Sequence, residues 1–215
     1  MLIRPQTDDD FREALYQLTA IDVSLAAVLQ RFGEPNFWHR QPGFATLVLF
    51  ILEQQVSLAS GAAAFNRLRA RVGQVTPTAV LVPTDSELRE DGFSRQKTRY
   101  MRELARAVLD GRIELVRMES EPDDEVRRQL LGLIGIGPWT ADVYLLSCLR
   151  RPDVWPVLDR ALQVATGEVL ALEAAPDPKR LLELGEQWRP HRSTAARLMW
   201  HAYLSKRGRK EITFD

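Results

Sequence analysis

Apolar residues recur at helical spacing along almost the whole sequence, and no stretch shows the alternating pattern of a strand. Residues that start or stop helices bracket these repeats, with Thr7 before the first, Gly33 after the second and Gly73 after the fourth. The sequence therefore predicts an all-α fold of roughly ten helices. The expected helices begin after Thr7 and then cover residues 21–32, 44–55, 58–72, 84–92, 94–111, 122–131, 138–149, 158–166, 177–187 and 191–206.

No long linker divides the chain, so we expect a single unit over residues 1–215 that has two lobes. We expect one lobe at residues 43–149 and the other at residues 1–42 plus 150–215. With 45% hydrophobic residues the chain can bury a substantial core.

Neither a bilayer span nor a signal peptide is visible. No apolar run approaches the roughly 20 residues that a span requires, and the first residues lack an apolar stretch with a cleavage site. We therefore expect a cytoplasmic protein, associated with the nucleoid if its source is a prokaryote.

The overall charge does not indicate a nucleic-acid partner. Lys plus Arg and Asp plus Glu both number 29, so the formal net charge is zero and any such partner must be bound by local patches. Lys206, Arg207, Arg209 and Lys210 form a basic end, for which solvation is the commoner explanation. The single Cys148 excludes an intramolecular disulfide, and it excludes an iron–sulfur site that needs several thiolates from this chain.

The segment LLGLIGIGPWTA, residues 130–141, is typical of a tight turn between two helices. Gly135 and Gly137 flank Ile136 and let the backbone turn with exposed amides, and Pro138 suits the first position of the next helix. Such amides, together with the start of a helix, suit a phosphate oxygen. A lone Gly-x-Gly is more often only backbone relief in an αα-turn.

This segment resembles the signature of the helix-hairpin-helix DNA glycosylases, in which a Leu-x-Gly-Ile/Val-Gly-x-x-Thr-Ala core precedes an apolar helix. The strings GPWTA (137–141), WPVLD (155–159) and QWRPHRS (187–193) together resemble the 3-methyladenine DNA glycosylase II branch, and the resemblance covers about residues 44–205. It implies a DNA-binding cleft between the two helical lobes. It also implies a monomeric base excision repair enzyme that flips alkylated bases, such as 3-methyladenine and 7-methylguanine, out of duplex DNA and hydrolyses the N-glycosidic bond.

The same resemblance implies roles for individual residues. Asp159 corresponds to the carboxylate that faces the sugar of the flipped nucleotide, although an acid there also simply favours a helix start. Trp139 and Trp200 correspond to walls of the base pocket, where a core position is the ordinary alternative. The implied DNA contacts are Gln54, Gln55, Ser57, Gly135, Ile136, Gly137, Thr140, Arg189, Arg192 and Ser193, with Gln55 as the wedge that fills the gap left by the base. A polar helix end explains the glutamines equally well.

Some positions depart from the family pattern. Trp139 lies where bifunctional relatives carry the nucleophilic lysine that precedes Thr-Ala, so we expect no lyase activity. Ile134 replaces a frequent proline, and we expect it at a buried turn position. Val143 and Arg160 occupy positions where relatives can carry aromatic pocket residues, which leaves the lesion range open.

We expect no redox cofactor, no iron–sulfur cluster and no metal bound by side chains. The resemblance leaves room for a monovalent cation, Na⁺ or K⁺, at the backbone of Ile134 and Gly137. Three alternatives stay open: the same fold acting on a deaminated or mismatched base, a noncatalytic helix-hairpin-helix DNA-binding module, and a purely structural helical protein. Only the glycosylases give Asp159 a chemical role.

Overall fold

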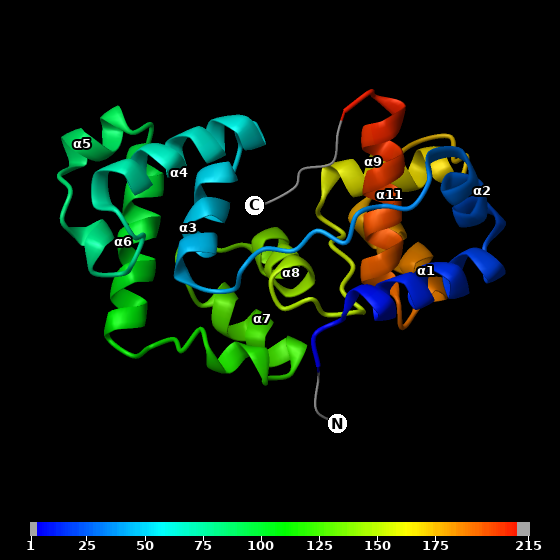
Figure 1. The fold of residues 1–215 in the computed structure, drawn as a ribbon, viewed down its shortest axis with the longest axis horizontal. Coiled ribbons are helices and arrows are strands. Elements are labelled where there is room, and N and C mark those ends of the chain that lie inside the picture. The colour runs from blue at the N-terminus through cyan, green and yellow to red at the C-terminus, as the bar shows by residue number, and fades with distance from the viewer. Residues whose placement is uncertain (1–3, 210–215) are drawn as a thin grey trace. The chain divides into compact units, whose positions relative to one another are not determined.

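The structure, a computed structural model, describes residues 4–209 of the chain. All regular elements within this range are helical, which confirms the prediction of an all-α fold (Figure 1). In the same range no helix combines the length and the apolar character that a bilayer span requires.

The chain forms two compact units. Unit 1 contains residues 1–40 and 145–215, and unit 2 contains residues 41–144. The expected lobes divided at 42/43 and 149/150, so both bounds differ by a few residues from the observed ones. The second division falls inside α8 (Pro138–Ser147), whose first residues belong to unit 2 and whose last residues belong to unit 1.

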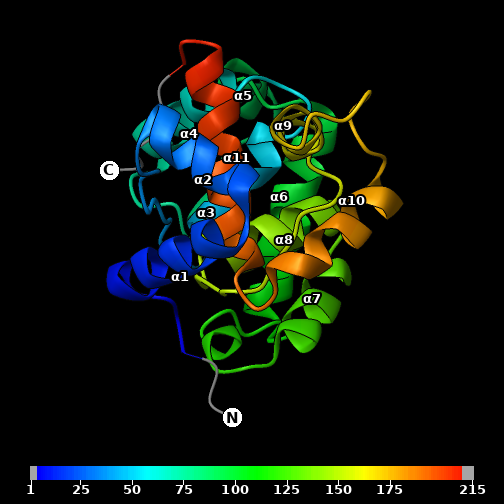
Figure 2. The same cartoon turned by 90° about the vertical axis from the view of Figure 1, so that its right-hand side faces the viewer.

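Unit 1 is organised around its last helix. α11 contacts α1, α2 and α9, and Figures 1 and 2 show it among these helices. Eight consecutive residues of α11, from Arg192 to Met199, are buried, because neighbours cover it on every side. The helices of this unit are α1 (Asp8–Ile21), α2 (Val23–Phe32), α9 (Arg160–Val169), α10 (Pro178–Gly185) and α11 (Arg192–Lys206), with a short 3₁₀ turn η3 (Glu186–Trp188).

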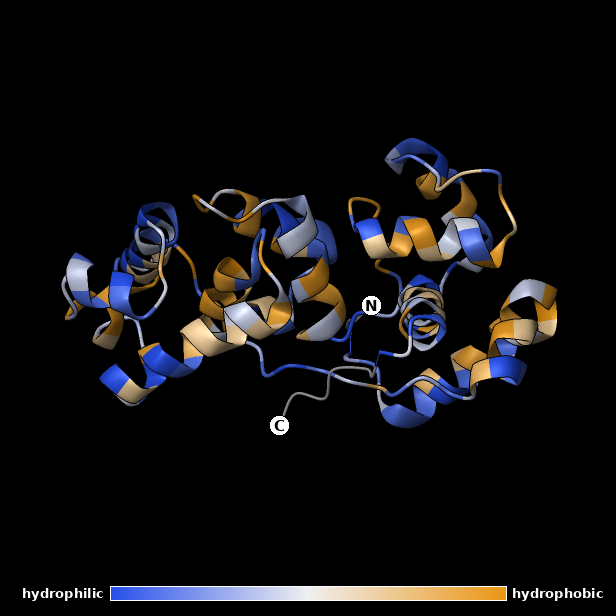
Figure 3. Ribbon diagram, turned by 90° about the horizontal axis from the view of Figure 1, so that it is seen from above, coloured by the Kyte–Doolittle hydropathy of each residue, from blue (hydrophilic) through white to orange (hydrophobic). Residues whose placement is uncertain are grey.

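Unit 2 is organised around an apolar helix. α3 contacts α4 and α6, and it buries residues around most of its circumference. The helices here are α3 (Phe44–Glu53), α4 (Leu58–Val72), α5 (Asp85–Glu90), α6 (Arg95–Leu109) and α7 (Asp123–Leu131), followed by the start of α8, with 3₁₀ turns η1 (Ala79–Leu81) and η2 (Arg117–Glu119). Hydrophilic and hydrophobic stretches alternate along the helical ribbons in Figure 3, as expected of amphipathic elements.

Local capping chemistry explains many helix limits. Thr7 caps α1 through its side chain, as the sequence predicts, and Thr84 and Ser94 cap α5 and α6 in the same way. Asp22 is the only residue between α1 and α2; it ends the first helix, and its carboxylate accepts bonds from the amides that open the second. The three 3₁₀ turns were not predicted, because three residues are too few to display a periodic pattern.

Candidate active site

The turn over residues 132–137, here called the hairpin, joins α7 to α8. Leu133 and Ile136 are 9% and 5% exposed and anchor the hairpin in unit 2. Arg127 of α7 donates from Nε and Nη2 to Asp142 Oδ1 of α8 at 3.0 and 2.9 Å. Because Asp142 is itself buried, this ion pair fixes the spacing of the two helices that flank the hairpin.

Gly135 and Gly137 of the hairpin differ in why a glycine occurs there. Gly135 has φ +92°, and a Cβ added there would overlap the ring of Tyr100. Gly137 has no positive φ, and an added Cβ would meet nothing within 4 Å. Within residues 4–209 the amides of both glycines donate to no backbone carbonyl. These amides are therefore positioned to bind an anionic oxygen.

The prediction that Ile134 is buried is wrong, because its side chain is 46% exposed. Leu133 and Ile136 anchor the turn instead, and Ile134, which lies between Leu133 and Gly135, is exposed. The Ile134 side chain is therefore not part of the core of unit 2.

The segment over residues 54–57, here called the Gln turn, connects α3 to α4. Gln54 donates from Nε2 to the carbonyl of Gly135 at 2.8 Å and to Thr140 Oγ1 at 3.4 Å. Gln55 is exposed and has φ +58°, a conformation that costs a non-glycine residue energy. Ser57 caps α4 by accepting from the Ser60 amide.

The exposure of the predicted DNA contacts in this region differs from residue to residue, among Gln54, Gln55, Ser57 and Thr140. Gln54 and Thr140 hold the Gln turn and the hairpin together, and Thr140 is only 2% exposed. Gln55 is exposed in the turn, and its role as a wedge stays a prediction. The DNA contacts of these four residues stay predictions.

Asp159 is the N-cap of α9 in unit 1, half-buried at the position that the sequence indicates. Its Oδ1 accepts from the Leu162 amide at 2.7 Å and from Trp200 Nε1 at 3.0 Å. The Asp159 side chain therefore caps α9 and also accepts a hydrogen bond from Trp200, a predicted pocket residue. Two donors from different helices fix the orientation of the carboxylate.

Trp38 and Arg197 extend this cluster and were missed from the sequence. The ring centroids of Trp38 and Trp200 are 5.9 Å apart with an interplanar angle of 38°. Arg197 is 1% exposed; it donates to the Trp38 carbonyl at 2.6 Å, and its guanidinium lies 4.5 Å from the centroid of the Trp38 ring. Because Trp38 lies in a loop without periodicity, no sequence pattern pointed to it.

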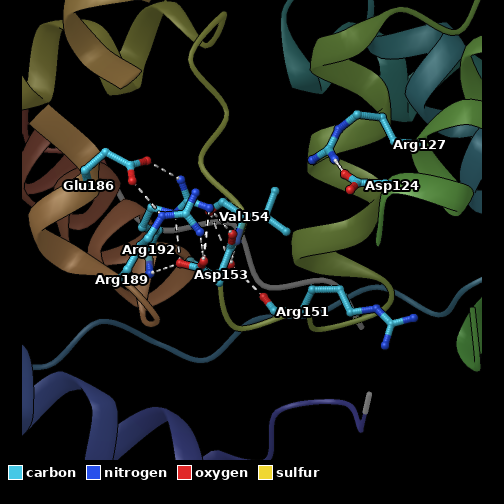
Figure 4. A network of polar contacts seen from close by, with 9 residues as sticks. Asp124, Arg127, Arg151, Asp153, Val154, Glu186, Arg189 and Arg192 are labelled. Atoms are coloured by element: carbon cyan, nitrogen blue, oxygen red, sulfur yellow. Dashed lines mark hydrogen bonds and ion pairs between the residues drawn. The ribbon is translucent and has the colours of Figure 1, made fainter. Parts of the chain in front are cut away.

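Arg192 lies at the start of α11 and faces the interior of unit 1 (Figure 4). It is 8% exposed, and it donates from Nε to Asp153 Oδ1 at 2.8 Å and from Nη1 to Glu186 Oε1 at 3.1 Å. Its donors are used within the protein, so a structural role replaces the predicted phosphate contact. Arg189 differs: it is exposed and pairs with Asp153 at 2.7 Å and Glu186 at 2.8 Å, and its DNA contact stays a prediction.

Ser193 requires the same correction as Arg192. It is 1% exposed, its hydroxyl donates to the Arg151 carbonyl at 2.6 Å, and the same oxygen accepts from the Val154 amide at 2.9 Å. Its side chain therefore fixes the loop that follows α8 to the start of α11, where a phosphate cannot reach it.

The remaining predicted positions are distributed between the two units. Trp139 is half-buried in the first turn of α8 in unit 2, and Trp200 is half-buried in unit 1. Val143 is 8% exposed, whereas Arg160 is exposed and donates to Gln163 Oε1 at 3.1 Å. The part that these side chains play in a base pocket stays a prediction.

No group of three or more His, Cys, Asp or Glu side chains is arranged to hold a metal ion within the described range. A monovalent cation at the backbone of Ile134 and Gly137 stays a prediction. Burial raises the pKa of the Cys148 thiol to about 12, so this side chain stays protonated and is a poor nucleophile.

Comparison with known proteins identifies what these features are similar to. The family model of the HhH-GPD superfamily base excision DNA repair proteins matches residues 48–191. This range includes the second half of α3, the Gln turn, the hairpin and Asp159. The structure of a Schizosaccharomyces pombe 3-methyladenine DNA glycosylase in complex with abasic DNA superposes with a TM-score of 0.79 and 25% identity, covering 87% of this chain and 95% of that one.

Curated relatives extend the comparison. DNA-3-methyladenine glycosylase 1 of Schizosaccharomyces pombe is 28% identical over 196 residues, which are 87% of this chain and 86% of the relative. Endonuclease III of Sulfolobus acidocaldarius is 29% identical over 172 residues, which are 78% of this chain and 73% of the relative. Two Bacillus subtilis relatives are longer, and the match spans 40% of the length of each.

Proposed function

The chain belongs to the HhH-GPD superfamily of base excision DNA repair proteins, and we propose that it is a monofunctional DNA glycosylase for alkylated bases. The observation that carries the proposal is the orientation of Asp159. Its Oδ1 is held by an amide of α9 and by the indole of Trp200, at the position that the family signature indicates. A capping role alone requires only the first of these bonds.

The proposed reaction is hydrolysis of the bond between the flipped base and C1′ of its deoxyribose. As this bond breaks, positive charge develops on the sugar, and a fixed carboxylate stabilises it without reorganising. Water then adds its oxygen to C1′ and gives up a proton, and the base leaves with the bonding electron pair. An alkylated purine already carries positive charge, so it leaves without strong protonation.

The proposed substrates are 3-methyladenine and 7-methylguanine in duplex DNA. The indoles of Trp139 and Trp200 support this choice, because electron-rich rings attract a cationic methylated purine through stacking and cation–π contact. We further propose that the protein acts as a monomer in the cytoplasm without a redox cofactor, and that a monovalent cation at the hairpin assists phosphate binding.

The absence of lyase activity is also a proposal. Cleavage of the strand by a bifunctional glycosylase requires an amine that forms a Schiff base with the sugar. Trp139 lies where the family motif of such enzymes has this lysine, and an indole cannot form the adduct. Borohydride treatment during turnover tests the proposal, because a trapped covalent protein–DNA adduct would contradict it.

One experiment separates the candidate functions. The protein is incubated with duplex DNA treated with a methylating agent, and the released bases are identified by chromatography. Release of 3-methyladenine and 7-methylguanine supports the proposal. Release only from duplexes that carry deaminated or mismatched bases would favour the second enzyme function, and salt-dependent binding without release would favour a noncatalytic module.

A further inference from the structure

The Gln turn is held by contacts at both of its ends. At its start, Lys97 of α6 donates from Nζ to the carbonyl of Leu52 at 2.7 Å. Beyond its end, Gly61 of α4 packs back on Glu53, the residue that precedes the turn. The approach is so close that a Cβ added at Gly61 would lie 2.7 Å from Glu53 Cγ. Gln55 lies between these contacts in its unfavourable positive-φ conformation, which persists only where surrounding structure fixes it.

Lys97 places a positive charge at the C-terminal end of α3. The last turn of α3 contains no basic residue, and its carbonyls carry the negative end of the helix dipole. Lys97 supplies the missing cation from a neighbouring helix. Partial burial lowers the pKa of its ammonium group, which indicates that solvent is partly withdrawn around this contact.

The same face of α6 also supports the hairpin. Tyr100 lies three residues after Lys97, so both side chains project from one face of the helix. Its ring packs against Gly135, and its hydroxyl accepts from Gln96 Nε2 at 2.6 Å. The Gly135 carbonyl in turn accepts from Gln54. One helix face therefore braces the Gln turn and the hairpin together within unit 2.

We propose that Lys97 is a positioning residue for base flipping, which holds the Gln turn so that Gln55 projects in a fixed orientation. The inference rests on the proposed function, because a wedge has a role only where a base leaves the stack. Lys97 contacts neither the DNA nor the reacting atoms in this account. It acts through the carbonyl of Leu52, by stabilising the end of α3 from which the turn departs.

The test measures flipping and excision separately. Duplex DNA with 2-aminopurine beside a methylated base reports unstacking by fluorescence, and single-turnover excision reports the chemical step. We expect Lys97→Met to lower both the amplitude of flipping and the excision rate about tenfold, the effect of losing one charged hydrogen bond. Lys97→Arg should restore most of the loss, because its guanidinium can still donate to the Leu52 carbonyl.

A matched control excludes simple attraction of DNA by charge. Arg99 is an exposed cation on the same helix, and Arg99→Met removes a charge without touching α3. We expect this variant to flip and excise normally. We also expect Lys97→Met to keep the wild-type salt dependence of DNA binding, whereas loss of a direct phosphate contact would reduce that slope. A reduced slope would overturn the proposal.

A double-mutant cycle with Gln55→Ala distinguishes an effect of Lys97 through Gln55 from a general loss of stability in Lys97→Met. If Lys97 acts through the wedge, its substitution in the Gln55→Ala background should add little further loss. Additive losses would overturn the inference and assign Lys97 to general stability. Wild-type protein that releases no base would instead contradict the proposed function, so the two failures are distinguishable.

Discussion

The hairpin and the surroundings of Asp159 present different chemical groups, backbone amides in the first and side chains in the second. The hairpin presents backbone amides, and its geometry depends on a glycine that no other residue can replace without overlap with Tyr100. The Asp159 cluster is built from side chains: a carboxylate, the indole of Trp200 and the tilted ring of Trp38 beside it. The first should be sensitive to a Cβ added at Gly135, and the second to the loss of single polar atoms.

Two further contacts, one in each unit, show the same difference. In unit 1 the buried guanidinium of Arg192 joins α11 to the loop at Asp153. In unit 2 the close approach of Gly61 to Glu53 and of Gly135 to Tyr100 determines the packing near the Gln turn. Loss of the Arg192 guanidinium should therefore loosen the start of α11 in unit 1, and a Cβ added at Gly61 or Gly135 should disturb the packing near the Gln turn in unit 2.

The largest effect on stability is expected from Arg192→Met in unit 1. Removing one partner of a buried ion pair leaves the Asp153 carboxylate poorly compensated, which costs about 3 kcal/mol of unfolding free energy. Denaturant titration measures the change. Arg189→Met removes an exposed guanidinium from the same carboxylate and should change the unfolding midpoint only slightly. Equal losses for the two variants would contradict the assignment of Arg192 to the interior.

A smaller loss is expected from Gly135→Ala in unit 2. The added Cβ overlaps the Tyr100 ring and the residue must keep φ +92°, which together should cost about 2 kcal/mol. Gly137→Ala is the matched control, since its Cβ meets nothing within 4 Å. Thermal unfolding of both variants tests the difference. If Gly137→Ala proves as unstable as Gly135→Ala, steric overlap is not what fixes the hairpin.

The smallest effect is expected from Trp200→Phe, which keeps an aromatic ring and removes the donor to Asp159. Because Asp159 retains the Leu162 amide, we expect a loss of about 1 kcal/mol of unfolding free energy. Double-mutant analysis with Asp159→Ala, which removes the acceptor, measures the coupling between the two side chains. Strict additivity would show that the bond contributes nothing to stability.

The sequence predicted the helices well because their information is local. Periodicity and capping residues such as Thr84 and Ser94 act within one helical turn. The backbone hairpin was also predictable, since Gly135 and Gly137 are separated by a single residue in the chain. Ile134 was misplaced because a resemblance indicates which residue type occurs at a position but not how far its side chain is exposed.

The contacts that orient the candidate site were not predictable, because they join residues far apart in the sequence. The rings of Trp38 and Trp200 lie side by side although the two residues are far apart in the sequence. Lys97 donates to a backbone carbonyl of α3, which any residue type could present. Arg192 was assigned to DNA because its positive charge fits a phosphate equally well. Only the structure reveals the half-buried carboxylate of Asp153 that it neutralises.

The most direct test of the account is single-turnover excision by Asp159→Asn on methylated duplex DNA. Asparagine caps helices as well as aspartate does, and its oxygen can still accept from Trp200, so fold and DNA affinity should be retained. The account predicts that the rate of base release falls at least about 100-fold, because a neutral amide cannot stabilise the charged sugar. Release at the wild-type rate by the folded variant would contradict it.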